Sequence, residues 1–178
     1  ILIDVSEKNK KLQKSFIDVI KFFIENCHLP ITVGGGISSL ENAKKIFNLG
    51  VEKIILNSST YRDIKITNNL ISIFGSSSII QAIDFKKDSL NKYIIKVDNG
   101  KESINYDTEK YLEFISSLNV GEIFFNSIDN DGGLMGFDLK LINKYSKYIK
   151  VPIIVQGGGG NWNHFYEVLK LDNISAAC

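Results

Sequence analysis

The chain has 178 residues, of which 44% are apolar and 23% are charged, and its formal net charge is +1. This balance is ordinary for a folded globular protein, and the length suits one domain with a buried core. A net charge near zero, without one dominant basic block, argues against a nucleic-acid surface. The short apolar runs argue against a membrane-spanning segment.

Cysteine and histidine are too sparse to suggest a disulfide framework or a metal centre. Cys27 and Cys178 are expected to be reduced thiols of a cytoplasmic protein. His28 and His164 show no metal-ligand spacing with them, so no metal site is expected. The sequence likewise suggests no cofactor.

Short apolar runs alternate with amphipathic stretches of helical length along the chain. The runs typical of strands buried on both faces are residues 1–5, 31–33, 53–57, 78–84, 122–128 and 151–155. The helix-like stretches include residues 14–27, 39–50 and 138–149, with Ser39 and Asp138 as expected N-caps and Gly50 as an expected stop. Residues 92–106 break the alternation and are typical of a β-hairpin turning at Asp98-Asn99-Gly100. Repeated β-α alternation predicts an α/β protein with a parallel sheet.

The sequence matches itself at an offset of 122 residues, the distance from Pro30 to Pro152. At this offset LPITVGGG (29–36) lies over VPIIVQGG (151–158), residues 1–4 lie over 123–126, and residues 53–56 lie over 175–178. Two units of four β-α modules predict a (β/α)8 TIM barrel made of two half-barrel repeats. An open doubly wound sheet is the alternative, and the strict repeat disfavours it.

A complete barrel of this kind needs about 250 residues. The chain opens directly on a strand and is shorter than that. We therefore expect a single, partial barrel domain over residues 1–178, without the first strand and its helix and without the last helix.

Glycines and polar residues follow the expected strands, and such barrels carry their chemistry at the carboxyl ends of the strands. Two glycine-rich ends are related by the repeat, Gly34–Gly36 and Gly157–Gly160. Glycine lets backbone N–H groups surround an anion, so we predict two phosphate sites and a substrate with a phosphate at each end. The predicted phosphate-binding residues are Gly36, Asn57 and Ser58 in one site and Gly132, Gly157 and Gly158 in the other. The alternative is that these glycines only make tight turns.

Carboxylates stand at the same strand ends. Asp84 closes an almost purely apolar strand, where burying a carboxylate is costly without a role or a partner. It is the first candidate for a general base, with a structural ion pair to Lys86 or Lys87 as the alternative. Asp131 is the second catalytic candidate, with an Asx-type turn as the alternative. For Asp4, a direct part in the chemistry and a hydrogen-bonding role beside the sites both stay open.

Six segments, taken in order, resemble one known family. They are TVGGGI (32–37), EKIILNSS (52–59), QAID (81–84), VGEIFFNSIDNDG (120–132), GFD (136–138) and PIIVQGGGG (152–160). These segments resemble the cyclase subunit of imidazole glycerol phosphate synthase, the HisF family of histidine biosynthesis. The resemblance covers essentially all of the chain, including the hairpin.

This resemblance implies a (β/α)8 barrel with a glutaminase (HisH-like) subunit docked at the N-terminal face of the strands. Ammonia from that partner would reach a bis-phosphorylated ribulosyl aminoimidazole carboxamide, and imidazole glycerol phosphate would form. By motif, Asp84 is the catalytic aspartate of the fifth strand, and the matching aspartate of the first strand is absent from this chain. Lys53 and Glu122 match charged residues near the ammonia entrance. Lys86 and Asn126, which also stand at strand ends, complete the expected substrate-binding set.

Several positions depart from the usual pattern of the family. Gly133 stands for threonine, Leu134 for a basic residue and Met135 for serine, while Asn126 and Gln156 replace threonine and serine. These positions face the substrate in the family. The alternatives are therefore a HisF-like ammonia-using subunit of nucleotide-sugar or surface-glycan amidation, or a phosphate-binding barrel without catalysis.

Overall fold

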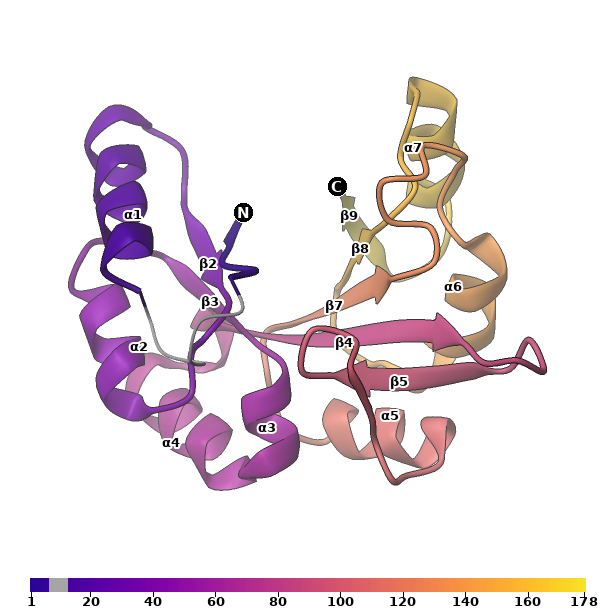
Figure 1. Ribbon diagram of the computed structural model, residues 1–178, viewed down its shortest axis with the longest axis horizontal. Helices are drawn as coiled ribbons and strands as arrows, with labels where there is room; N and C mark the ends of the chain where they lie inside the picture. The colour runs from indigo at the N-terminus through magenta and orange to yellow at the C-terminus, as the bar shows by residue number, and fades with distance from the viewer. Residues whose placement is uncertain (7–12) are drawn as a thin grey trace. The chain divides into compact units, whose positions relative to one another are not determined.

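The computed structural model describes residues 1–6 and 13–178 and contains two compact units, Ile1–Ile80 and Gln81–Cys178 (Figure 1). Both units alternate strands with helices, and their repeated strand pairs are parallel. This arrangement confirms the predicted fold class, that of a partial (β/α)8 barrel. The single barrel domain over residues 1–178 stays a prediction.

The first unit pairs β1, β2 and β3 in parallel. Leu2 of β1 lies opposite Val33 of β2, and Thr32 of β2 lies opposite Lys53 of β3. Figure 1 shows α1 and α2 beside these strands. In chain order the elements are β1 (Leu2–Ile3), α1 (Lys14–Asn26), β2 (Thr32–Gly34), α2 (Leu40–Phe47), β3 (Lys53–Leu56), α3 (Ser58–Arg62), α4 (Ile64–Phe74) and the 3-10 turn η1 (Ser76–Ser78).

Periodic apolar residues of these helices meet the strands in one core. Ile20 of α1, Ile46 of α2 and Leu70 of α4 are completely buried, together with Val33 of β2. The predicted cap of α2 is confirmed, because the Asn42 N–H donates to the Ser39 hydroxyl at 3.1 Å. The helices therefore cover the strands and leave the strand ends to carry the polar residues.

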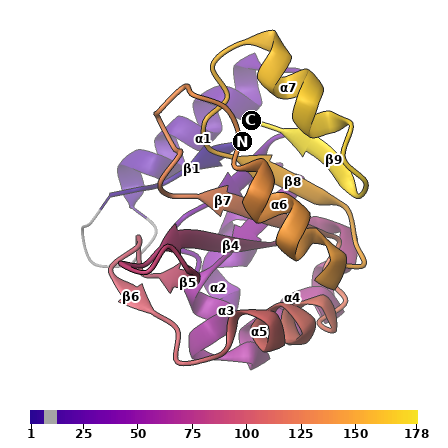
Figure 2. The same cartoon turned by 90° about the vertical axis from the view of Figure 1, so that its right-hand side faces the viewer.

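The second unit orders four strands as β4-β7-β8-β9, with parallel pairing from β7 to β9. Figure 2 shows these strands side by side, with α6 in front of them. The strand expected at residues 175–178 is present as β9. In chain order the elements are β4 (Ile79–Lys87), β5 (Tyr93–Val97), β6 (Glu102–Ser103), α5 (Thr108–Ser116), β7 (Glu122–Ser127), α6 (Leu139–Tyr145), the 3-10 turn η2 (Ser146–Tyr148), β8 (Ile153–Gln156), α7 (Trp162–Leu169) and β9 (Ile174–Ala177).

The predicted hairpin is present, and it lengthens the preceding strand. β5 and β6 pair antiparallel, and the turn residues Asp98, Asn99 and Gly100 have φ of 57°, 55° and 77°. β4 runs on to Lys87 because its last residues pair antiparallel with β5. The sequence pattern ended this strand at residue 84, since the extension depends on a neighbour that the apolar run does not reveal.

Aromatic packing fixes which way the strand ends of the second unit point. The ring of Phe85 lies 5.0 Å from Phe125 and 5.5 Å from Tyr145 of α6, measured between centroids. Successive side chains of a strand point to opposite faces. Asp84 and Asn126, each adjacent in sequence to one of these phenylalanines, therefore point to the face away from α6.

The helices offer no membrane-spanning element. Over residues 1–6 and 13–178, none of them combines the length and the apolar character that a bilayer crossing requires.

Candidate active site

In the first unit, Asp4 lies against the glycine turn that follows β2. The Asp4 N–H donates to the Gly34 carbonyl at 2.9 Å, and the Asp4 carboxylate accepts the Ser6 N–H at 2.8 Å. Gly35 has a φ of 91°, and a Cβ placed on it would lie 2.2 Å from the Asp4 carbonyl oxygen. Gly36 has a φ of 65° and is exposed. The close approach at Gly35 accounts for one glycine, and Gly36 is accessible to a ligand.

The other two residues predicted for this phosphate site stand at the same edge. Gly34 of β2 pairs with Ile55 of β3, so the glycine turn and Asn57 follow neighbouring parallel strands. Asn57 precedes α3, and its side chain makes no capping hydrogen bond to that helix. Ser58 is the first residue of α3 and is half-buried. The structure thus brings the predicted phosphate-site residues of the first unit to one strand edge.

In the second unit, Asp84 and Asn126 are in direct contact. The Asn126 Nδ2 donates to the Asp84 Oδ1 at 2.9 Å, and both residues are half-buried. The Asn126 Oδ1 is buried and has no hydrogen-bond partner within the described residues. The predicted catalytic carboxylate is therefore held by a neighbouring predicted site residue.

The two lysines considered as ion-pair partners of Asp84 have different surroundings. Lys86 is exposed, and its backbone pairs with Ile94 across the hairpin. The Lys87 ammonium lies 3.1 Å from the Oδ2 of Asp138. Lys87 is therefore committed to another carboxylate.

The buried carboxylate of Asp138 is the predicted cap of α6, and it also binds a side chain from outside that helix. Its Oδ1 accepts the Leu141 N–H at 3.1 Å, which confirms the cap. The Tyr93 hydroxyl donates to its two carboxylate oxygens at 2.9 and 3.0 Å. Burial raises the pKa of Tyr93, and the hydrogen bond to Asp138 raises that pKa further. The sequence does not indicate this contact, because no local pattern connects residues 45 positions apart.

The loop that follows β7 is closed by Asn130, a residue that sequence analysis did not single out. Its Nδ2 donates to the Gly136 carbonyl at 2.9 Å, and its Oδ1 accepts the Ser127 hydroxyl at 3.3 Å. The Asp131 N–H donates to the Ser127 carbonyl at 3.0 Å. The Asp131 carboxylate is exposed and accepts no hydrogen bond from the residues that the structure describes. The turn is therefore made by Asn130 and the backbone, and the carboxylate of Asp131 faces solvent.

The glycines after β8 pack tightly against this loop. Gly157 and Gly158 are buried, with φ of 101° and 103°. A Cβ on Gly158 would lie 2.1 Å from the Gly136 carbonyl oxygen, and one on Gly157 would lie 2.7 Å from that of Ser127. The Gly136 N–H also donates to the Gly158 carbonyl at 2.7 Å. Packing alone accounts for glycine here, and a phosphate role for this turn stays a prediction.

The turn before α7 is bonded to its own helix. The Asn161 side chain caps α7 by accepting the N–H groups of Asn163 and His164 at 3.0 and 3.2 Å. The Gly160 N–H donates to the Nδ1 of His164 at 3.1 Å. This amide is therefore engaged within the turn, whereas Gly132, with a φ of 71°, has open space around it.

The two residues predicted for the ammonia entrance each begin a strand. Lys53 is the first residue of β3, and Glu122 is the first residue of β7. Both are half-buried. They lie at the strand ends opposite the predicted catalytic residues, as expected, and their role stays a prediction.

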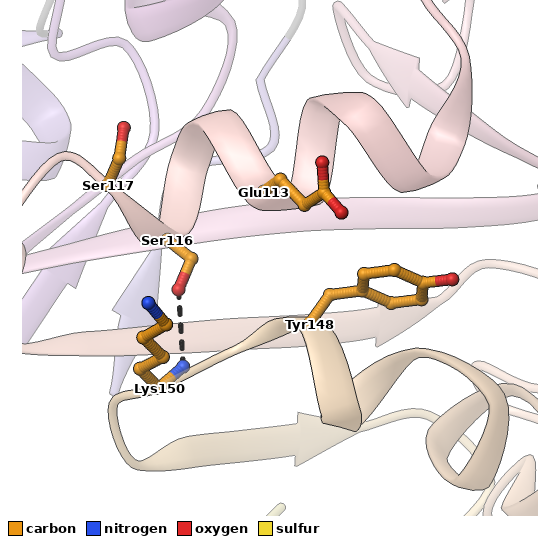
Figure 3. Close-up of a pocket in the computed structure, with 5 residues that line it drawn as sticks. All are labelled: Glu113, Ser116, Ser117, Tyr148 and Lys150. Atoms are coloured by element: carbon orange, nitrogen blue, oxygen red, sulfur yellow. Dashed lines mark hydrogen bonds between the residues drawn. The ribbon is translucent and has the colours of Figure 1, made fainter.

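A pocket in the second unit lies on the strand-start side, between the end of α5 and the segment that enters β8. It is lined by Glu113, Ser116, Ser117, Tyr148 and Lys150, and the Lys150 N–H donates to the Ser116 hydroxyl at 3.2 Å (Figure 3). It contains none of the predicted site residues. In the described part of the chain, no three His, Cys, Asp or Glu side chains gather in a way that could hold a metal ion.

The fold and these strand ends define a class of protein. It is a parallel β/α protein whose carboxylate, amide and glycine residues gather at the carboxyl ends of strands, as in ligand-binding (β/α)8 barrels. The sequence model of a family described as histidine biosynthesis protein matches residues 1–178. The chain therefore belongs to the histidine biosynthesis protein family.

Relatives of the chain carry the name imidazole glycerol phosphate synthase subunit HisF. The one from Pyrobaculum aerophilum is 37% identical over 153 residues, covering 86% of this chain and 60% of the relative. The one from Hydrogenobaculum sp. is 32% identical over 176 residues, covering 99% and 69%, and the one from Bacillus cereus AH187 is 33% identical over 177 residues, covering 99% and 70%. These similarities confirm the resemblance to the HisF family. The chain spans 60 to 70% of the length of the curated relatives it matches.

Proposed function

We propose that the chain is part of the cyclase subunit of an imidazole glycerol phosphate synthase, acting in histidine biosynthesis. The contact between Asp84 and Asn126 carries this proposal, because it fixes a half-buried carboxylate at the carboxyl end of β4. A general acid or base needs a fixed position within reach of the reacting atoms. The names of the HisF relatives support the same reaction.

The proposed roles divide between strand ends. Asp84 transfers protons at the reacting centre. The exposed carboxylate of Asp131 is the second acid–base group, and Asp4 and Lys86 position the substrate. The glycine turns with Asn57 and Ser58, and with Gly132, would hold the terminal phosphates of a ribulosyl aminoimidazole carboxamide.

Ammonia is the proposed nitrogen donor, delivered by a glutaminase partner. The relatives are named as subunits, which supports a partner chain. Lys53 and Glu122 begin their strands, opposite the proposed chemistry. Charged groups at those strand starts would line the ammonia entrance.

A second candidate is a HisF-like, ammonia-using subunit for nucleotide-sugar amidation. The loop after β7 favours this second candidate. Leu134 and Met135 are 63% and 88% exposed, at positions where the HisF family of histidine biosynthesis usually has polar residues. Leu134 also has a φ of 55°, so its backbone holds an uncommon conformation. A different substrate would contact this loop.

The test uses the full-length protein with the ribulosyl substrate and an ammonium salt. Turnover is followed by loss of the absorbance of the aminoimidazole substrate. Asp84→Asn should lower turnover about 10²- to 10⁴-fold, the usual contribution of a general acid or base. Asp88→Asn is the matched control: its carboxylate accepts the Leu90 and Lys92 N–H groups in the hairpin, and activity should stay within about twofold.

Each outcome selects among the candidates. If Asp84→Asn lowered turnover less than tenfold, Asp84 would not be the catalytic residue. Absence of turnover by a folded wild-type protein would contradict the proposed role in histidine biosynthesis. The second candidate function would then be assayed with a nucleotide sugar and ammonium. Absence of both activities would favour a phosphate-binding barrel without catalysis.

A further inference from the structure

Lys87, the last residue of β4, is held by both ends of the loop that follows β7. This loop comprises residues 128–138. Near its start, the Asp129 Oδ2 accepts the Lys87 backbone N–H at 2.7 Å. At its end, the Asp138 Oδ2 lies 3.1 Å from the Lys87 ammonium. One residue of β4 therefore binds the loop at both of its ends.

The contact with Asp129 lies where the loop leaves the sheet. The Ile128 N–H donates to the Phe85 carbonyl of β4 at 2.9 Å, a backbone bond between neighbouring chain segments. Two residues further along β4, the Lys87 N–H donates to the carboxylate of Asp129. The bonding between β4 and this loop thus passes from backbone to side chain at Asp129.

The contact with Asp138 is shielded from solvent on one side. The Asp138 side chain is 6% exposed and that of Lys87 is 35% exposed. The Lys87 ammonium also lies 5.1 Å from the ring centroid of Tyr93, its register partner in β5. Asp138 in turn caps α6 by accepting the Leu141 N–H. A partly buried, charge-assisted contact keeps its geometry better than an exposed ion pair, so this end of the loop is fixed to both β4 and α6.

These contacts lie behind the proposed reacting groups. Successive side chains of a strand point to opposite faces, so Lys87 shares the face of Phe85 and Asp84 points to the other face. Between the two ends of the loop stand Asp131 and Gly132, both exposed. Lys87 can therefore fix the loop that carries them without touching a ligand beside Asp84.

We propose that Lys87 is a positioning residue: through Asp129 and Asp138 it holds the loop after β7 on β4, and so sets Asp131 and Gly132 relative to Asp84. This inference rests on the proposed function, in which Asp84 and Asp131 transfer protons and Gly132 contacts a phosphate. It gives the alignment of these groups a physical basis in residues that need not touch the substrate.

The first test measures the loop itself, in the full-length protein without substrate. Lys87→Met removes the ammonium and keeps the backbone N–H, whereas Asp129→Ala removes the acceptor near the start of the loop. In each variant the backbone amides of residues 128–138 should exchange hydrogen about tenfold faster, as measured by mass spectrometry. Exchange in α5 should change by less than about twofold. Equal protection of the loop in wild type and both variants would overturn the proposal.

Kinetics with the ribulosyl substrate and an ammonium salt test the positioning role. Lys87→Met should lower kcat and raise KM for the phosphorylated substrate, each about tenfold, because small displacements of aligned groups are costly. A smaller folded fraction would lower only the apparent kcat, so an unchanged KM would overturn the proposal. Lys87→Arg keeps a cation for Asp138 and should bring both constants within about threefold of wild type.

Asp129 decides the matter if Lys87→Met does not fold. Asp129 is exposed, and Asp129→Ala should change kcat and KM in the same directions as Lys87→Met. Asp129→Asn keeps an acceptor oxygen and should stay within about twofold of wild type. Lys140→Met, at an exposed position of α6, is the matched control for the lost charge, and it should leave both constants within about twofold.

The two proposals can fail separately. Faster exchange of the loop in both variants, with no turnover by the folded wild-type protein, would retain the contacts that hold the loop and contradict the proposed function. Turnover with constants that Lys87→Met and Asp129→Ala leave within about twofold would retain the function and overturn the positioning role.

Discussion

Gly36 in the first unit and Gly158 in the second occupy the same place in the repeat, yet their surroundings differ. Gly36 is exposed, whereas Gly158 is buried with its Cα against the Gly136 carbonyl. The loop after β7 packs against the second turn through Ser127, Gly136 and Leu134. The same glycine motif therefore serves as an accessible turn in one unit and as a packing surface in the other.

This difference shows that a glycine motif in the sequence does not by itself indicate phosphate binding. Positive φ and close approach are required at Gly35 and Gly158 whether or not an anion binds. An anion site needs accessible N–H groups in addition, and of these two turns only the first has its third glycine, Gly36, at an exposed position. The first unit is thus the better supported of the two predicted phosphate sites.

The largest expected effect is at the buried turn. Gly158→Ala would place a Cβ 2.1 Å from a backbone oxygen at a φ of 103°. Strain and overpacking together should cost about 3 kcal/mol or more in the free energy of unfolding. Urea unfolding of the full-length protein, followed by circular dichroism, measures it.

Gly132→Ala is the control for that substitution, because Gly132 also has a positive φ but meets nothing within 4 Å. If both variants lost the same stability, packing of the loop against the turn would contribute nothing. The turns at Gly36 and Gly158 would then differ only in the exposure of their glycines.

Gly35→Ala should cost less, about 2 kcal/mol. Its Cβ would lie 2.2 Å from the Asp4 carbonyl oxygen, a clash as severe as that at Gly158. However, β1 has only two residues and Ile3 is 39% exposed, so this strand can shift. The same urea unfolding experiment gives the value. A cost equal to that of Gly158→Ala would show that the first turn is held as rigidly as the second.

Most of the fold was predictable from the sequence because it depends on local patterns. Apolar runs located the strands, and Ser39, Asp138 and the turn at Asp98 to Gly100 behaved as their chemistry requires. The extension of β4 to Lys87 was not predictable, because it exists only through pairing with β5.

The candidate site was predictable in part. Strand-end position indicated Asp84 and Asn126, and the structure brings them into contact. The loop-closing role of Asn130 and the Tyr93 contact of Asp138 were missed. Both depend on three-dimensional neighbours, and an asparagine or a tyrosine in the sequence does not specify its partner.

Tyr93→Phe tests what holds Asp138, at the end of the loop that follows β7. It removes the donor to Asp138, whose carboxylate keeps the Leu141 N–H and the Lys87 ammonium. We expect a loss of about 1–2 kcal/mol in the free energy of unfolding near pH 7. Tyr166→Phe, at a side chain that is 62% exposed, should change little.

The pH dependence of this variant has a definite sign. Because burial and Asp138 raise the pKa of Tyr93 in the folded protein, its hydroxyl stabilises the fold fully below the unfolded pKa of 10.0. Above that pH the unfolded chain loses the proton first, so the stabilisation declines. The stability difference between wild type and Tyr93→Phe should therefore narrow as pH rises above about 10. A difference that widened there would contradict the buried, protonated hydroxyl.

The smallest expected effect is at Gly132, a glycine of the loop after β7 that has open space around it. Gly132→Ala should cost about 1 kcal/mol, because the only penalty is a side chain at a φ of 71°. Asparagine tolerates positive φ better than alanine, so Gly132→Asn should cost about half as much. Urea unfolding in the absence of phosphate measures the stability of both variants. Because both variants keep the backbone N–H, a loss of phosphate binding that exceeds this small loss of stability would show that Gly132 approaches a ligand directly.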